Sequence, residues 1–229
     1  MTKPSDPNAA NARKARVSNS PRVGRGRAAK PMSLCICDFD ALFASTVASW
    51  VRSDDELVWL APRTLPPLTA TKVMAWGRQR ANRYLLWNAA SATPVGYTEL
   101  NEMPGENAHF WIGHFLIAPP ARGLGLGRKF VHALLWRAFH DLGACEVSLV
   151  VFPDNLPAIK SYEACGMKTT GREIKHFKER RRQFELIRMA VKRREFERMA
   201  AGGELSPRSI HFIEDAALLR QGPIRLPFE

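Results

Sequence analysis

Two hydrophobic periodicities alternate along the chain. Short runs of branched and aromatic residues, bounded by turn residues, are typical of β-strands, and the run at 84–100 has the small central residues of a hairpin. Residues 128–142 instead place apolar side chains at helical spacing, a further helix is expected at 154–167, and two more precede the hairpin. The predicted strand segments are 34–37, 84–100, 109–118, 146–152 and 183–191. This order predicts an α/β domain.

A glycine-rich turn connects a predicted strand with a predicted helix. Pro119 and Pro120 stop the strand because proline cannot donate to a ladder, and glycines follow at positions 123, 125 and 127. Glycine adopts backbone angles that other residues avoid and lets an anion approach the main chain. A helix N-terminus adds unpaired N–H groups and a positive dipole end. The turn therefore predicts a backbone cradle for a diphosphate, with a plain tight connection as the alternative.

Two other phosphate-binding motifs fit this turn poorly. A Walker loop ends in Gly-Lys-Ser/Thr, whereas this turn ends in Gly127-Arg128-Lys129 and lacks the metal-binding hydroxyl. A dinucleotide fingerprint has its glycines spaced GxGxxG in the first strand–helix unit, whereas these are spaced GxGxG in mid-chain.

The segment 154–167 carries a second pattern that follows a strand. Asn155 suits a helix cap, and Gly166 suits the helix end. Ala158 and Tyr162 are four residues apart, which puts them on one face of the helix.

The two patterns together resemble the GNAT superfamily of N-acetyltransferases, whose signature couples an arginine- and glycine-rich acyl-CoA loop to a later Asn, Ala, Tyr and Gly series. The resemblance runs from about residue 35 to residue 192, and the leading segment is similar to a bacterial subgroup with an undefined acceptor. It implies the GNAT acyl-CoA N-acyltransferase fold: a single α/β domain with a mixed, mainly antiparallel sheet flanked by helices. We expect a basic disordered tail at 1–31, the N-acetyltransferase domain at 32–194 and a C-terminal extension at 195–229.

In this family the strand before the cradle and the next strand run parallel through a right-handed crossover, and acyl-CoA lies where they part. The resemblance implies that acetyl-CoA is the co-substrate, that a primary amine attacks it directly in a ternary complex, and that no metal is needed. The alternative is a non-catalytic acyl-CoA-binding sensor or assembly module. The residues expected to bind the cofactor are Phe115, Leu116, Ile117, Arg122, Gly123, Leu124, Gly125, Leu126, Gly127, Arg128, Asn155, Ala158 and Tyr162.

The resemblance also suggests catalytic side chains. Tyr162 stands where the family has the hydroxyl that protonates the departing thiolate, although an ordinary helix aromatic would also explain it. Many members carry a general-base glutamate on the strand before the cradle, but residues 109–111 contain none. Glu99 is the first choice of base. The alternatives are a relay through water or one of the side chains Glu102, His109 and His114.

Composition bounds the protein further. Its 229 residues suffice for one sizeable core, and no apolar stretch approaches the roughly 20 residues of a membrane span, so we expect a cytoplasmic protein, monomeric or homodimeric. The four cysteines and six histidines show no metal-site spacing. Cys145 or Cys165 acting as an acyl carrier is a variant of the mechanism.

The formal charge of +12 is concentrated in two segments. Residues 1–31 hold eight basic residues against one Asp, and residues 172–198 hold eleven against five Glu. The first segment can make weak electrostatic contact with nucleic acid, but it has no aromatic residues to stack on bases. The second is expected to form a charged turn, the closing strand and a helix; it can attract CoA phosphates or an acidic acceptor. A short helix is expected at 210–219.

Overall fold

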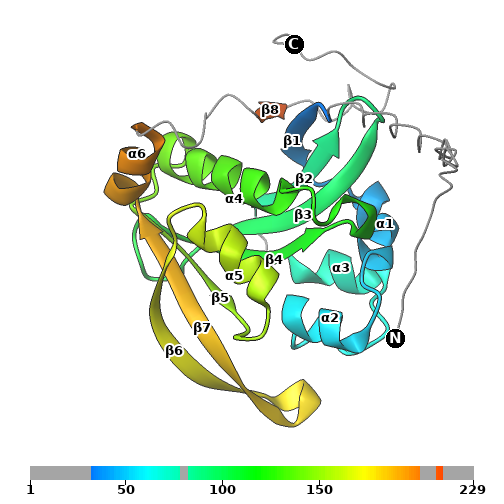
Figure 1. Cartoon of the computed structure of the whole chain (residues 1–229). Helices are drawn as coiled ribbons and strands as arrows, with labels where there is room; N and C mark the ends of the chain where they lie inside the picture. Colours follow the sequence, from blue (N-terminus) through cyan, green and yellow to red (C-terminus); the bar gives the residue numbers. More distant parts are fainter. Residues whose placement is uncertain (1–31, 78–81, 202–209, 214–229) are drawn as a thin grey trace, which may run out of the picture. The chain divides into compact units, whose positions relative to one another are not determined.

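A computed structural model describes residues 32–77, 82–201 and 210–213, so the tail at 1–31 lies outside the described residues. Eight strands form one sheet, with bounds β1 Leu34–Asp38, β2 Asn82–Asn88, β3 Thr93–Glu102, β4 His109–Ile117, β5 Glu146–Val151, β6 Lys168–Phe177, β7 Arg182–Lys192 and β8 His211–Ile213. Their order is β6-β7-β5-β4-β3-β2-β1-β8 (Figure 1). The pairs β4–β5 and β1–β8 are parallel and the others antiparallel, which confirms the expected mixed sheet.

Helices connect these strands. Three α-helices, rather than the two expected, stand between β1 and β2, because the chain breaks twice at proline- and serine-containing turns. The helices are α1 Ala44–Ser49, α2 Asp54–Leu60, α3 Ala70–Trp76, α4 Leu126–Trp136, α5 Leu156–Glu163 and α6 Arg193–Ala201. Short helical turns are η1 Ala41–Phe43, η2 Pro119–Ala121, η3 Arg137–Asp141 and η4 Lys178–Arg180. None of the described helices is long and apolar enough to cross a membrane.

The core lies between α4 and the sheet. Phe130 and Leu134 of α4 are fully buried, as are Leu85 and Leu100 on the β2–β3 hairpin. Burying each such side chain stabilises the fold by about 1.5–3 kcal/mol. The helix approaches the sheet so closely that a Cβ at Gly96 of β3 would lie 3.2 Å from the Phe130 ring. Glycine at this position therefore sets the distance between helix and sheet.

Strands β4 and β5 pair over only part of their length. The parallel ladder joins His109–Trp111 to Glu146–Ser148, and beyond this point β4 continues to Ile117 without a partner on that side. On its other side β4 contains a bulge opposite β3, where the register shifts between Tyr97 and Glu99 and His114 has a φ of 43°. The two strands therefore part near their carboxyl ends, as the resemblance implied, and a bulge turns the backbone at that point.

Two segments near the C-terminus differ from the expectation. A helix at 210–219 is wrong at its start, because residues 211–213 form β8 and pair with β1; the aromatic and branched run His-Phe-Ile suits an exposed sheet edge. The charged turn is also narrower than expected, because β6 extends to Phe177 and forms a long ribbon with β7 (Figure 1). The helix after β7 is present as α6.

Candidate active site

The cradle has the backbone geometry that its glycines allow. Gly125 is the N-cap of α4 with a φ of 72°, and Gly123 has a φ of 76°. The first helical bond runs from the Lys129 N–H to the Gly125 carbonyl at 3.3 Å. Within the described part of the chain, the N–H groups of residues 123–128 donate to no protein acceptor. A row of unpaired donors at the positive end of an 11-residue helix is suited to an anion.

The two arginines of the cradle differ. Arg122 is turned toward α2: its Nη1 donates to Glu56 at 2.7 Å, its Nη2 to the Trp50 carbonyl at 3.2 Å and its Nε to the Ile117 carbonyl at 3.0 Å. Its own N–H donates to Pro119. The side chain of Arg122, which was expected to bind the cofactor, therefore holds the end of β4 against α2. The Nε of Arg128 is buried and has no partner among the described residues.

A cavity of about 540 Å³ opens where β4 and β5 part. Phe115 of β4 and three residues around α5, Asn155, Ala158 and Tyr162, line its cradle side. The opposite side is formed by residues 59–64, which lie at the end of α2 and just after it, and by the β6–β7 ribbon. Asn155 both lines the cavity and caps α5, since its side chain accepts from the Ala158 N–H at 3.4 Å. Ala158 and Tyr162 share the cavity-facing side of the helix, as their spacing predicted.

Tyr162 is 6% exposed and packs edge-on against Phe115, with ring centroids 6.0 Å apart. Burial raises its pKa, so the hydroxyl keeps its proton at neutral pH. The hydroxyl has no hydrogen-bond partner among the residues that the structure describes. Tyr162 is therefore packed like an ordinary core aromatic, yet it keeps an uncommitted donor at the cavity.

Glu99 and His114 form a pair at the floor of the cavity. Glu99 is 2% exposed; it accepts from the Tyr97 hydroxyl at 2.8 Å and lies 3.1 Å from His114 Nδ1. The His114 contact has the distance of an ion pair but not the angle of a hydrogen bond. Burial raises the pKa of Glu99, but His114, Tyr97 and the Arg83 charge outweigh it, so the pKa lies below its usual value. Glu99 is therefore ionised at neutral pH.

The bulge in β4 sets the position of His114. Its imidazole stacks on Trp76 of α3, with centroids 4.3 Å apart and planes 7° apart, and its side chain is 19% exposed. Trp76 is itself fixed, because its Nε1 donates to Thr64 Oγ1 at 2.9 Å. His114 lines the cavity. Its Nδ1 atom faces Glu99, so the Nε2 atom on the other side of the ring is the nitrogen left for the cavity.

The remaining base candidates lie elsewhere. Glu102 is exposed at the end of β3, and His109 bonds to Glu106 at 2.5 Å and to Ser148 at 2.8 Å; neither lines the cavity. Trp111, in the stretch where many GNAT members have a glutamate, lines the cavity with an apolar ring. From the sequence, Glu99 and His114 were alternative general bases, whereas the fold brings them together. The contact of His114 with Trp76 was not predicted, because α3 is distant from β4 along the chain and no sequence motif links them.

The comparison with protein families decides the identity of this fold. Residues 47–167 match the model described as the acetyltransferase (GNAT) family. The chain belongs to the GNAT acetyltransferase family. Among solved structures, the fold is similar to spermidine N-acetyltransferase from Vibrio cholerae in complex with CoA and spermine, with a TM-score of 0.61 and 18% identity over 72% of this chain and 98% of the other. It is also similar to AAC(6')-Ib in complex with ribostamycin and coenzyme A, with a TM-score of 0.57 and 20% identity over 72% and 97%.

The cysteines of this GNAT protein do not suit an acyl carrier. Cys165 is fully buried, its thiol donates to the Arg128 carbonyl at 3.3 Å, and burial raises its pKa to about 12. Cys145 is exposed but precedes β5, whereas Val150 and Val151 at the other end of that strand line the cavity. In the described ranges no cluster of three or more His, Cys, Asp or Glu residues could hold a metal ion.

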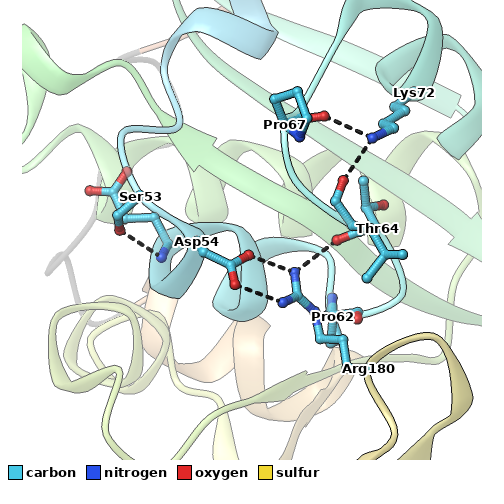
Figure 2. A network of polar contacts seen from close by, with 9 residues as sticks. Ser53, Asp54, Pro62, Thr64, Pro67, Lys72 and Arg180 are labelled. Atoms are coloured by element: carbon cyan, nitrogen blue, oxygen red, sulfur yellow. Dashed lines mark hydrogen bonds and ion pairs between the residues drawn. The ribbon is translucent and has the colours of Figure 1, made fainter.

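A clasp joins the tip of the β6–β7 ribbon to residues 59–64 of the cavity wall (Figure 2). Arg180, in η4 at the ribbon tip, donates to both oxygens of Asp54 at 3.0 and 2.9 Å. It also donates to the carbonyls of Pro62 and Thr64 at 2.9 and 2.8 Å, and its side chain is only 10% exposed. The clasp spans 126 residues of sequence, so no local pattern could have predicted it.

Proposed function

We propose that this protein transfers the acetyl group of acetyl-CoA to a primary amine by direct attack in a ternary complex. The observation that carries the proposal is the row of unpaired N–H groups at residues 123–128, which adjoins a cavity containing an imidazole and an uncommitted phenol. Membership of the GNAT family supports acetyl-CoA as the donor. The solved structures named above contain CoA together with spermine or ribostamycin, which supports an amine acceptor in general.

The diphosphate of CoA is proposed to accept hydrogen bonds from the N–H groups of Gly123, Leu124, Gly125, Leu126, Gly127 and Arg128. The pantetheine arm follows the unpaired edge of β4 along Phe115, Leu116 and Ile117, and one N–H of that edge polarises the thioester carbonyl. Arg128 adds positive charge near the phosphates, and Arg122 contributes by holding the strand end in place. Asn155 and Ala158 form the wall on the other side of the arm.

The proton of the attacking amine is proposed to pass to His114 Nε2. Glu99 lies behind the ring, where its carboxylate stabilises the imidazolium that forms. This refines the first choice made from the sequence, because a carboxylate that is 2% exposed acts best through its partner. Glu99 and His114, which the sequence left as alternative bases, are thus proposed to act together as one proton-accepting pair.

Tyr162 is proposed to protonate the departing thiolate, because its hydroxyl is protonated at neutral pH and unpaired at the cavity. A Tyr162→Phe variant keeps the ring that contacts Phe115 and removes only the hydroxyl group. We expect kcat to fall by about 10²-fold or more while the Kd for CoA is unchanged. Unchanged turnover in Tyr162→Phe would show that the side chain serves packing alone.

The function is tested with the full-length protein, acetyl-CoA and a pool of primary amines. Thiol release is followed with a chromogenic disulfide, and CoA binding is measured separately by calorimetry. We expect CoA to bind and to be released catalytically only when amines are present. Tight CoA binding without catalytic release with any amine would favour the non-catalytic acyl-CoA-binding module.

A further inference from the structure

The cavity lining carries more positively than negatively charged side chains. Arg63 and Lys175 belong to it, whereas the carboxylate among the described lining residues is Glu99. Glu99 is already bonded to Tyr97 and paired with His114. A polycationic amine would therefore meet two cations and no free carboxylate in this lining, and such an arrangement of charge repels it.

The clasp of Figure 2 holds the backbone on both sides of Arg63. Arg180 donates to the carbonyls of Pro62 and Thr64, which are the residues directly before and after Arg63. The Thr64 N–H also closes a turn onto the Ala61 carbonyl at 2.8 Å. The backbone that carries Arg63 is thus fixed on both sides, so little order has to be imposed when a ligand binds.

The guanidinium of Arg63 is uncommitted. It makes no hydrogen bond or ion pair with any residue of the described ranges, in contrast to Arg122 and Arg180. Lys175 has one distant partner, Glu173 at 4.0 Å, which is also shared with Arg188. Arg63 is an exposed residue of the cavity lining. A free guanidinium fork at such a position matches a carboxylate with two parallel hydrogen bonds.

The cavity lining also has an apolar part. Besides Trp76, Phe115 and Tyr162, it contains the aromatic residues Trp59, Trp111, Phe152 and Phe177. The volume of about 540 Å³ suits a small molecule beside a pantetheine arm. Resting on the acetyl transfer proposed above, we infer that the acceptor is a small amine that also carries a carboxylate and an apolar body, and that Arg63 binds the carboxylate.

Three compounds on one phenyl scaffold test this inference with the full-length protein. L-Phenylalanine carries both groups, phenethylamine only the amine, and 3-phenylpropionate only the carboxylate. We expect kcat/KM for acetylation of L-phenylalanine to exceed that of phenethylamine by roughly ten- to hundredfold, the worth of one charge-assisted hydrogen-bonded pair. Arg63→Ala should remove this preference by raising KM for L-phenylalanine alone, and Arg63→Glu should reverse it. Arg172→Ala, which removes an exposed arginine of β6 outside the cavity lining, is the matched control and should keep the preference.

A binding measurement separates this inference from the proposed function. Tryptophan fluorescence of the CoA-loaded protein reports ligands without turnover, because Trp59, Trp76 and Trp111 line the cavity. 3-Phenylpropionate should bind the wild-type protein and Arg172→Ala, and should bind Arg63→Ala at least tenfold more weakly. Carboxylate binding without acetylation of either amine would overturn the acetyl transfer and leave the anion site standing. Any of three results would overturn the anion site. The first is an equal kcat/KM for the two amines, and the second is 3-phenylpropionate binding by Arg63→Ala as tight as by the wild-type protein. The third is an effect of Arg63→Ala that is confined to CoA affinity.

Discussion

The two halves of the candidate site are built by different means. The cradle half comes from one continuous segment, residues 115–128, and offers mainly backbone N–H groups. The acceptor half is assembled from side chains of α2, α3, β3, β4 and the β6–β7 ribbon, and it depends on the Arg180 clasp. A site made of main chain tolerates changes of side chain but not of backbone angle. A site made of side chains can change its ligand through single substitutions, and this difference predicts how each half fails.

The largest effect is expected from Gly125→Ala in the cradle. Gly125 has a φ of 72°, where a Cβ costs about 1–2 kcal/mol and shifts the N–H groups away from the diphosphate. We expect calorimetry to detect no CoA binding by this variant. Gly105→Ala is the control, because Gly105 has a φ of 79° and, like Gly125, open space around its Cβ position, but lies outside the cradle. Equal CoA binding by both variants would contradict the cradle.

The next effect concerns the junction of the two halves. His114→Ala removes the proposed proton acceptor and should lower kcat by about 10²–10³-fold, with CoA affinity unchanged. Glu99→Gln should lower kcat less, since it leaves the imidazole in place. His109→Ala is the control, because that ring is bonded to Glu106 and Ser148 away from the cavity. A pH–rate profile that keeps its acidic limb, the fall in rate at low pH, in His114→Ala would assign proton transfer to water.

A smaller effect is expected from Arg180→Ala at the ribbon tip. Without its bonds to Asp54, Pro62 and Thr64 the acceptor wall loosens, so KM for the amine should rise by about three- to tenfold. The Kd for CoA should not change, because Arg180 makes no hydrogen bond or ion pair with the cradle among the described residues; the two share only α2, through Asp54 and Glu56. Steady-state kinetics and calorimetry, run beside Arg172→Ala, check this separation; a parallel loss of CoA affinity would show that the halves are coupled.

The smallest effect is the contribution of Glu99 to stability. Its folded-state pKa is lowered below the model-compound value of 4.5, so its ionisation stabilises the fold above that pH. This contribution is lost as the pH falls through the lower folded-state pKa. Urea unfolding should therefore show a larger deficit for Glu99→Gln at about pH 7 than at about pH 3. A deficit independent of pH, or one matched by the exposed Glu102→Gln, would contradict the ionised pair.

Particular residues show which features could be predicted from the sequence and which could not. The glycine turn and the shared face of Ala158 and Tyr162 were predicted because each depends on spacing within one or two neighbouring elements. The parallel pair β4–β5 was implied by the family resemblance. The helix expected at 210–219 was wrong at residues 211–213, because these residues pair with β1, some 175 residues earlier. Residues 214–219 lie outside the described residues. The role of the Arg122 side chain also changed, since its partner Glu56 lies 66 residues away.

By itself the sequence determined the strand, glycine turn and helix of the cradle unit, the face shared by Ala158 and Tyr162, and the membership of a fold family, because local periodicity and backbone preferences are properties of short segments. Tertiary structure alone decided that His114 stacks on Trp76 beside Glu99 and that Arg180 fixes the loop that carries Arg63. Those contacts join residues 15 to more than 100 positions apart. Their geometry depends on sheet register, a strand bulge and close packing, and no single segment encodes these.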